Sequence, residues 1–206
     1  MMRKFDESKL VTELERLPIV FRVGFAAACA ERQMSAYRLF EAASGGGGAP
    51  DSLEHALDHV WAEPTRTKSV AELEHQIEEV MALIPQEDGA QREWTQEATN
   101  AQNAGMSVVY ALRTRLTGEA QEAAWAARVA YEALDNFVIN KEAIDTSVPG
   151  GELRVVSHPL VQAELERQER DLRELLAASD GEVEKVLQQL RDRSRAESAL
   201  FFGPVS

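Results

Sequence analysis

Apolar residues recur at three- and four-residue steps through most of this chain, and this spacing restricts the fold more than any other feature. One face of an α-helix has that period, whereas the side chains of a β-strand alternate at every second position. The sequence therefore predicts an all-α protein, folded over residues 1–206 as a single-domain helical bundle of about seven to eight helices. The expected helices cover residues 6–17, 19–43, 51–62, 69–84, 92–117, 119–144, 159–178 and 181–200.

Glycine and proline mark the breaks between the expected helices. The stretch SGGGGAP predicts a Gly-rich link at residues 44–50, and SVPGGELRVVSHP belongs to an expected crossing loop over 145–158. A short extended piece is the alternative for that loop, because its leucine and valines are compatible with a strand. The two periodic segments that follow predict a helical hairpin over 159–200.

Gly105 stands inside the helix expected at 92–117, on the same face as Val108, Val109 and Leu112. A glycine inside a helix destabilises it by about 1 kcal/mol relative to alanine. We therefore expect the backbone of another helix to pass close to Gly105.

The chain carries 35 acidic and 22 basic side chains, which gives a formal net charge of -13. An excess of carboxylates repels phosphate groups, so direct nucleic-acid binding and docking to an anionic membrane surface are disfavoured. Arg191, Arg193 and Arg195 do not change this inference, because residues two apart on a helix point in different directions. They are interpreted as solvated charges, and the overall acidity favours a basic partner.

Cys29 is the single cysteine, so we expect no intrachain disulfide, no cysteine-based zinc cage and a reducing, cytoplasmic location. The N-terminal residues lack the apolar core of a signal peptide, and no segment is apolar over enough length to span a membrane. The sequence also lacks a nucleophile elbow, a phosphate-binding P-loop and a dinucleotide-binding glycine motif. It therefore predicts no catalytic residue and no cofactor.

His55 and His59 stand four residues apart on an expected helix, a spacing that can place two imidazoles on one metal ion. Leu57 and Val60 belong to the apolar face of that helix, and the two histidines lie opposite it. Because a third ligand is missing, we expect no physiological metal site and, at most, adventitious binding.

Arg32 is the unusual polar residue of the chain, because it lies on an apolar helix face. The other residues of this face are Phe21, Phe25, Ala28, Cys29, Ala36 and Leu39. A buried guanidinium needs carboxylate or carbonyl partners, so the sequence predicts a buried interhelical ion pair. Asp58 and Glu63, which flank the buried face of the next helix, are the expected partners, since Glu31 points about 100° away.

A ligand-binding cleft between two helices is the alternative for this region. Five residues would line it, namely Glu31, Arg32, Tyr37, Asp58 and Trp61. The arginine would there hold a carboxylate or phosphate with two hydrogen bonds, and the two aromatic rings would supply a flat apolar wall.

The sequence around Arg32 resembles a known family. The residues that carry the resemblance are Phe25, Ala28, Cys29, Glu31, Arg32, Tyr37, Phe40, Leu57, Asp58 and Trp61, followed by LIPQED at 83–88 and RLTGE at 115–119. In this order the chain is similar to the YjaG-like domain-of-unknown-function family 416 (DUF416), over about residues 13–141 and again over 160–200. The resemblance implies an all-α, cytosolic bacterial protein and brings no established activity.

The chain departs from the family pattern at two places. It has Ser35-Ala36 where the family has Pro-Asn, and Ala62 where the family has an acid directly after the tryptophan. The acid follows one position later as Glu63, and one position on a helix is a turn of about 100°. A role of that acid does not transfer to Glu63.

Three functions are open at this point. The favoured one is an acidic protein–protein interaction module, of which a toxin-neutralising immunity protein is one concrete version. The second is a small-anion binder or enzyme that uses a cleft formed by Arg32, Glu31 and Asp58. The third is a self-associating homodimer, in which Trp125, Phe137 or the tail ALFFGPVS forms the contact, since exposed phenylalanines are otherwise unfavourable.

Overall fold

The structure of the protein, a computed structural model, describes residues 2–43, 50–62, 69–86 and 94–202. Within these ranges it contains nine α-helices, one short 3-10 helix and no strand, which confirms the all-α prediction. None of the helices described is long and apolar enough to cross a membrane. The helices are α1 (Glu7–Glu15), α2 (Ile19–Ala43), α3 (Pro50–Ala62), α4 (Val70–Leu83), α5 (Gln96–Thr117), α6 (Ala120–Lys141), α7 (Gly151–Val156), α8 (Pro159–Ala177) and α9 (Val183–Ser198), with the 3-10 helix η1 at Asp180–Glu182.

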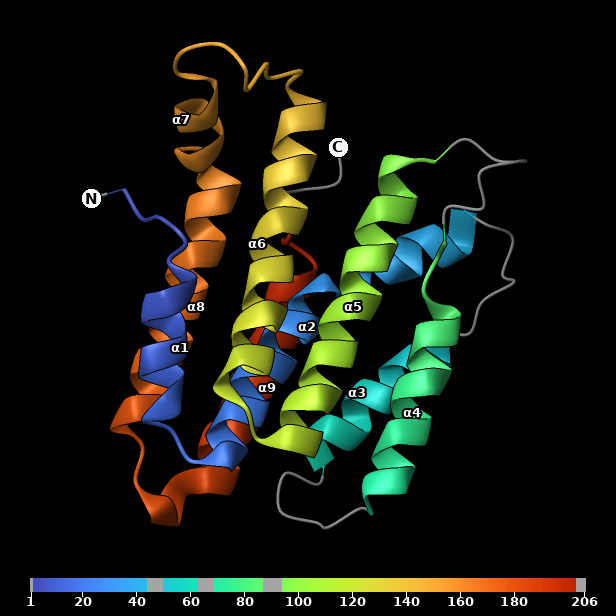
Figure 1. The fold of residues 1–206 in the computed structure, drawn as a ribbon, viewed down its shortest axis with the longest axis vertical. Coiled ribbons are helices and arrows are strands. Elements are labelled where there is room, and N and C mark those ends of the chain that lie inside the picture. The colour runs from blue at the N-terminus through green and yellow to red at the C-terminus, as the bar shows by residue number, and fades with distance from the viewer. Residues whose placement is uncertain (1, 44–49, 63–68, 87–93, 203–206) are drawn as a thin grey trace.

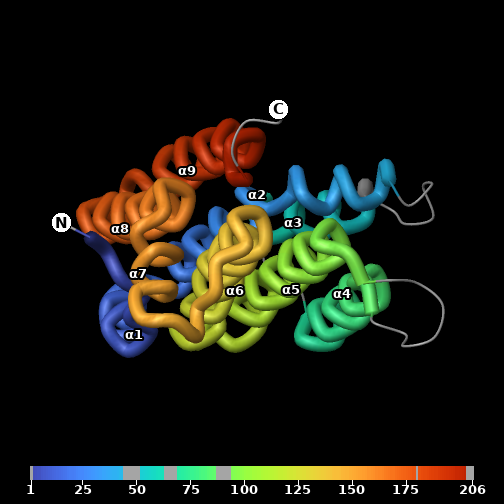
Figure 2. The backbone as a smooth tube through the Cα atoms, turned by 90° about the horizontal axis from the view of Figure 1, so that it is seen from above, coloured from blue at the N-terminus to red at the C-terminus, as the bar shows by residue number. Residues whose placement is uncertain are grey.

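The central helix of the bundle is α2. In Figure 1, α1, α6, α5 and α4 lie side by side in a row, and α2 crosses behind them. Figure 2 shows the same row from above, with α3, α8 and α9 on the other side of the molecule. Because neighbours contact α2 from several directions, most of its side chains from Phe21 to Tyr37 are buried.

Local sequence signals set the ends of α4 and α5. The hydroxyl of Ser69 accepts the N–H of Glu72 at the start of α4, and the carboxylate of Glu72 accepts the N–H of Ser69 in return. Thr95 caps α5 in the same way, by accepting the N–H of Ala98 at 3.2 Å. α5 ends at Gly118, whose φ of 73° suits glycine better than any other residue.

The segment 145–158 is not entirely a loop, because Gly151–Val156 forms the short helix α7. The alternative extended piece is also wrong, since Val155 is buried inside this helix. Two consecutive glycines permit the turn into α7, because Gly150 has a φ of 87° and a side chain on Gly151 would collide with the backbone of Asp145.

The other two expected segments differ in how much of them is described. The hairpin segment 159–200 contains α8 and α9, joined through η1. Of the Gly-rich link, residues 44–49 lie outside the described part of the chain, and Pro50 begins α3.

Two interior glycines make room for side chains of neighbouring helices. A Cβ on Gly105 of α5 would lie 2.6 Å from Cγ1 of Ile84, the residue that directly follows α4. A Cβ on Gly24 of α2 would collide with Leu187 of α9. The expected close backbone at Gly105 is therefore wrong, because an isoleucine side chain fills that space.

The described part of the C-terminal tail folds back onto the chain. Phe201 is buried, and the ring of Phe202 packs edge-on against Phe137 of α6 with their centroids 4.9 Å apart. Trp125, also of α6, is half-buried and packs against Tyr110 of α5. These aromatic rings are therefore covered, at least in part, by their own chain.

Candidate functional site

Arg32 lies in a buried network of ion pairs between α2 and α8. Its Nε and Nη2 donate to Oε2 and Oε1 of Glu164 at 3.0 and 2.9 Å, and its Nη1 donates to Oδ2 of Asp171 at 2.8 Å. All three side chains have an exposed fraction of 0%. Every nitrogen of the guanidinium therefore has an acceptor that belongs to the chain itself.

α8 brings both carboxylates to Arg32, because Glu164 and Asp171 are two helical turns apart on one face. Gln168 lies between them, and its Nε2 donates to Oε1 of Glu164 and to the carbonyl of Ala127 on α6, each at 3.0 Å. Burial by itself lowers the pKa of Arg32, but the charges of Glu164 and Asp171 outweigh it and hold that pKa well above its usual value. The guanidinium thus stays charged in a fully buried place.

α9 extends the network toward the surface. Arg193 donates to Oδ1 of Asp171 at 2.9 Å and to Glu174 at 2.7 Å. Asp171 is therefore shared by an arginine of α2 and an arginine of α9, so three helices meet at one carboxylate. The interpretation of Arg193 as a solvated charge is wrong, since its guanidinium binds two carboxylates of α8.

The expected partners of Arg32 are also wrong where the structure describes them. Asp58 of α3 binds Arg195 at 2.8 Å and also Arg191, both from α9, and its side chain is 44% exposed. Glu63 lies outside the described residues. Asp58 does not reach Arg32 because α8 supplies the acceptors there, while Asp58 faces α9.

Glu31 belongs to a second cluster, between α2, α3 and α9. Its Oε2 accepts from Nε1 of Trp61 at 2.9 Å, and its Oε1 accepts from Nε of Arg195 at 3.0 Å. Since Arg195 also binds Asp58, three of the residues expected in one cleft do meet here. Arg32 is not among them, because consecutive residues of a helix point about 100° apart.

Tyr37 lies apart from both clusters. Its hydroxyl donates to the carbonyl of Leu83, the last residue of α4, at 3.2 Å. Burial, with the neighbouring charge of Glu41, raises the pKa of Tyr37 to about 12. The five residues expected to line a cleft thus occupy three separate places, and the one that would bind an anion is already paired.

Glu164 and Asp171 were not predicted as site residues, and Arg195, interpreted from the sequence as a solvated charge, binds Glu31 and Asp58. A signal for the first two was available, because Glu164, Gln168 and Asp171 follow three- and four-residue steps on the face of α8 that also carries Leu175. Polar residues on such a face indicate partners in the core. Arg195 gave no comparable signal, since charged residues cover most of α9 outside the face of Leu187 and Leu190.

His55 and His59 are both exposed on α3. Nδ1 of His59 lies 3.1 Å from the side-chain amide of Gln76 on α4, which is a hydrogen bond between the two helices. In the part of the chain that the structure describes, no three side chains of His, Cys, Asp or Glu are arranged to hold a metal ion.

α4 lies at the margin of the bundle, where it packs against α5 and α3 (Figures 1 and 2). It contains no lysine and no arginine. Four exposed residues form one face of this helix, and we name this face the acidic edge: Val70, Glu74, Glu78 and Met81. Val70 and Met81 are 61% and 42% exposed, and the two glutamates have no ion-pair partner among the described residues.

The fold and the buried arginine together define a class of protein. It is all-α, and its central helix carries an arginine that is paired with carboxylates of a later helix. The chain belongs to the family described as Protein of unknown function (DUF416), whose model matches residues 9–199. This finding confirms the resemblance based on the residues around Arg32. No curated protein matches the chain.

A solved structure is similar over nearly the whole chain. It is the crystal structure of a DUF416 family protein from Shewanella baltica, with a TM-score of 0.78 and 16% sequence identity. The match covers 98% of this chain and 100% of the other. At this identity the likeness shows a shared fold alone.

Proposed function

We propose that this protein is an acidic protein–protein interaction module that binds a basic surface of its partner through the acidic edge of α4. The observation that carries the proposal is the combination, on one face, of two large exposed apolar side chains with two carboxylates that have no ion-pair partner in the described part of the chain. Buried apolar contacts supply affinity in such interfaces, and complementary charge supplies association rate and specificity. A toxin-neutralising immunity protein is one concrete form of this module.

The charge of the whole chain supports a cationic partner. With a net charge of -13, the chain repels acidic proteins and attracts basic ones. α4 adds a local field of one sign, because its exposed glutamates are not balanced by any lysine or arginine of the same helix. Charges of this kind are screened over about 10 Å at 0.1 M salt, so the association is expected to weaken as salt rises.

α4 is also held firmly enough to serve as a binding face. Ser69 and Glu72 cap its start, Ile84 fills the recess at Gly105, and the hydroxyl of Tyr37 binds its last carbonyl. A face that is ordered before binding loses less conformational entropy on association. The buried Arg32 offers no such face, because its guanidinium is paired within the chain.

The test compares two pairs of neutral substitutions on exposed glutamates. The variant Glu74→Gln/Glu78→Gln changes the acidic edge, and Glu152→Gln/Glu184→Gln changes α7 and α9 by the same charge. A partner is isolated from an extract of the host at low salt, purified, and titrated with the native chain and both variants. We expect the acidic-edge variant to bind about tenfold more weakly and the control to bind like the native chain.

Two results would contradict the proposal. One is a partner that both variants bind as tightly as the native chain does. The other is an extract that yields no partner at low salt, because electrostatic association is strongest there.

A further inference from the structure

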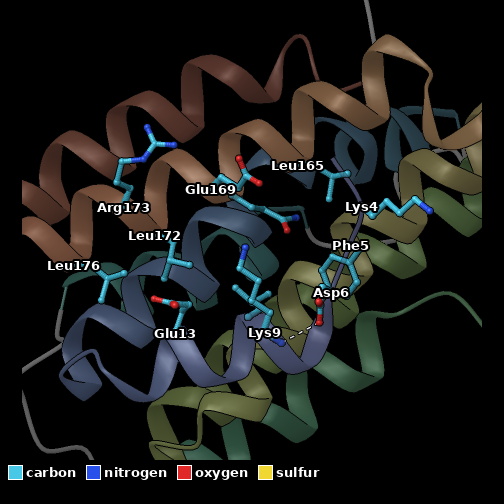
Figure 3. A pocket seen from close by; sticks show the side chains of 12 residues that line it. Lys4, Phe5, Asp6, Lys9, Glu13, Leu165, Glu169, Leu172, Arg173 and Leu176 are labelled. Atoms are coloured by element: carbon cyan, nitrogen blue, oxygen red, sulfur yellow. Dashed lines mark hydrogen bonds between the residues drawn. The ribbon is translucent and has the colours of Figure 1, made fainter. Parts of the chain in front are cut away.

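A groove of about 430 Å³ runs between the N-terminal segment with α1 on one side and α8 on the other (Figure 3). We name it the α1–α8 groove. Its apolar lining consists of Phe5, Leu10, Leu165, Leu172 and Leu176, of which only Leu165 is fully buried. Its volume falls within the range of roughly 300–1,000 Å³ that is common for small-molecule sites.

The two walls of this groove are fixed from behind. On the α1 side, Glu7 accepts from Gln121 and Arg128 of α6 at 2.8 and 3.2 Å, and Phe5 stacks on Tyr131 with centroids 5.2 Å apart. α8 is fixed by the bonds of Glu164 and Asp171 to Arg32, described above. Because each helix is tied to a different neighbour, the groove does not close by collapse of one wall onto the other.

One end of the groove is bridged by the chain itself. The N–H of Arg3 donates to Oε1 of Gln162 on α8 at 2.8 Å, and Nε2 of Gln162 donates to the carbonyl of Arg3 at 2.9 Å. This pair of bonds fastens the segment before Lys4 and Phe5 to α8. The groove is therefore bounded at this end and extends along the leucines of α8 toward Leu176.

The carboxylates that line the groove are all engaged within the chain. Asp6 accepts the N–H of Lys9 at 3.0 Å and caps α1, Glu13 binds Arg16 at 2.6 Å, and Glu169 binds Arg3 at 2.8 Å. Glu13 and Glu169 are thus each paired with an arginine, and Asp6 is bonded to a backbone N–H at the start of α1.

The cations that line the groove are not compensated in this way. Lys4, Lys9 and Arg173 have no ion-pair partner in the described part of the chain. Figure 3 shows the Lys9 side chain extending from α1 toward α8, with Lys4 at the Leu165 end of the groove and Arg173 toward its opposite end. Lys9 is therefore the cation that is placed to meet a ligand inside the groove.

We propose that the α1–α8 groove binds a small amphipathic anion, an aliphatic carboxylate. Its tail lies along the leucines of α8, and its head group is held by Lys9, whose side chain extends into the groove. Leu165 and Leu176 are about 16 Å apart along the helix axis, given the rise of 1.5 Å per residue, which leaves room for an extended alkyl chain. The apolar lining selects the tail, and Lys9 selects the charge.

Decanoate, kept below its micelle concentration, is the probe for this site. Isothermal titration measures its affinity, and decan-1-ol is the neutral ligand with the same tail. We expect decanoate to bind one saturable site and decanol to bind about tenfold more weakly or not at all. Amide NMR shifts are expected to concentrate at Phe5, Leu172 and Leu176.

Two variants test the role of the cations. Lys9→Met/Arg173→Gln removes two charges from the groove, and Lys185→Met/Arg154→Gln removes two exposed charges on α9 and α7. All four residues are exposed, so thermal melts of both variants should match the native chain. We expect the groove variant to bind decanoate at least about tenfold more weakly and the control variant to bind it like the native chain.

Each of the other results overturns the proposal. If decanoate shows no saturable binding, the groove is not a ligand site for this chemistry. If decanol binds as tightly as decanoate, or the groove variant as tightly as the native chain, the cations do not select an anion. NMR shifts that map to another face would also overturn it.

Discussion

The two sides of α2 are packed by different means. Val23, Ala30 and Tyr37 stand at seven-residue steps roughly opposite Arg32, on a side of the helix made largely of apolar residues. The other side also buries apolar residues such as Phe25 and Cys29, but there Arg32 meets two carboxylates of α8, and one of these also meets an arginine of α9.

This difference separates stability from specificity. Apolar packing stabilises in proportion to the area it buries, and many side chains of similar size satisfy it. A buried charge is stable only against its own partner, because an unpaired ion in the core is strongly unfavourable. Apolar residues therefore contribute burial on both sides of α2, while the ion pairs of Arg32 determine which later helix packs against that side and in which register.

The largest effect is expected for Arg32→Ala, because it leaves Glu164 and Asp171 buried without their common donor. We expect the free energy of unfolding to fall by about 3–5 kcal/mol, measured by denaturant titration. Arg32→Lys should lose much of the same amount, since an ammonium group cannot form the bidentate pair. Arg173→Ala, an exposed arginine of α8, is the control, and a loss below about 1 kcal/mol for Arg32→Ala would refute this account of the ion pairs of Arg32.

In the apolar core, Leu112→Ala in α5 is expected to cost about 2–5 kcal/mol through the cavity it leaves. The contrast with Arg32 lies in the conservative substitution. Leu112→Met keeps nearly the same volume and should cost less than about 1.5 kcal/mol. For each position, the loss of unfolding free energy in the conservative variant is divided by the loss in the alanine variant. If this ratio were the same for Leu112→Met and for Arg32→Lys, the proposed difference between apolar packing and the ion pairs of Arg32 would be refuted.

Gly105→Ala tests the recess between α4 and α5. The new Cβ would meet Ile84 at 2.6 Å, so we expect a loss of about 1–2 kcal/mol despite the better helix propensity of alanine. In an Ile84→Ala background the same substitution should be neutral or stabilising, because the collision is gone. Gly181→Ala, which would meet nothing within 4 Å, is the control, and thermal melts of these variants provide the measurement.

The smallest effect is expected for Asp58→Asn. The pairs of Asp58 with Arg191 and Arg195 are partly exposed, so the loss in a denaturant melt should stay below about 1 kcal/mol. It should also add to the effect of Arg32→Ala without coupling, because the two residues share no partner. A coupling above about 0.5 kcal/mol in the double-mutant cycle would place Asp58 in the same network as Arg32 after all.

Much of the fold follows from local signals in the sequence. The long helices α2, α5 and α6 lie close to their expected ranges, because their apolar periodicity is sustained over several turns. α7 was missed since six residues contain too few turns to establish a period. The recess at Gly105 was expected as a close approach, but whether a backbone or a side chain fills it depends on a residue of another helix.

The site was less accessible to sequence reasoning. Arg32 lies on an apolar helix face, so the sequence shows that it needs an acidic partner. The predicted partners, Asp58 and Glu63, were taken from the next helix along the chain. Glu164 lies 132 positions away along the chain. The cations of the α1–α8 groove gave no signal either, because an exposed lysine looks the same in sequence whether or not an acid lies beside it.

The sequence by itself determined where this chain is helical, which face of each helix is apolar, and that the arginine on the central helix requires compensation. These properties are local, since they follow from the period of the helix and the cost of burying a charge. Only the tertiary structure decided that Glu164 and Asp171 provide this compensation, that Asp58 turns to α9, and that α1 and α8 stand apart as a groove. The physical reason is that helix neighbours depend on the packing of all the faces together, which no single helix specifies.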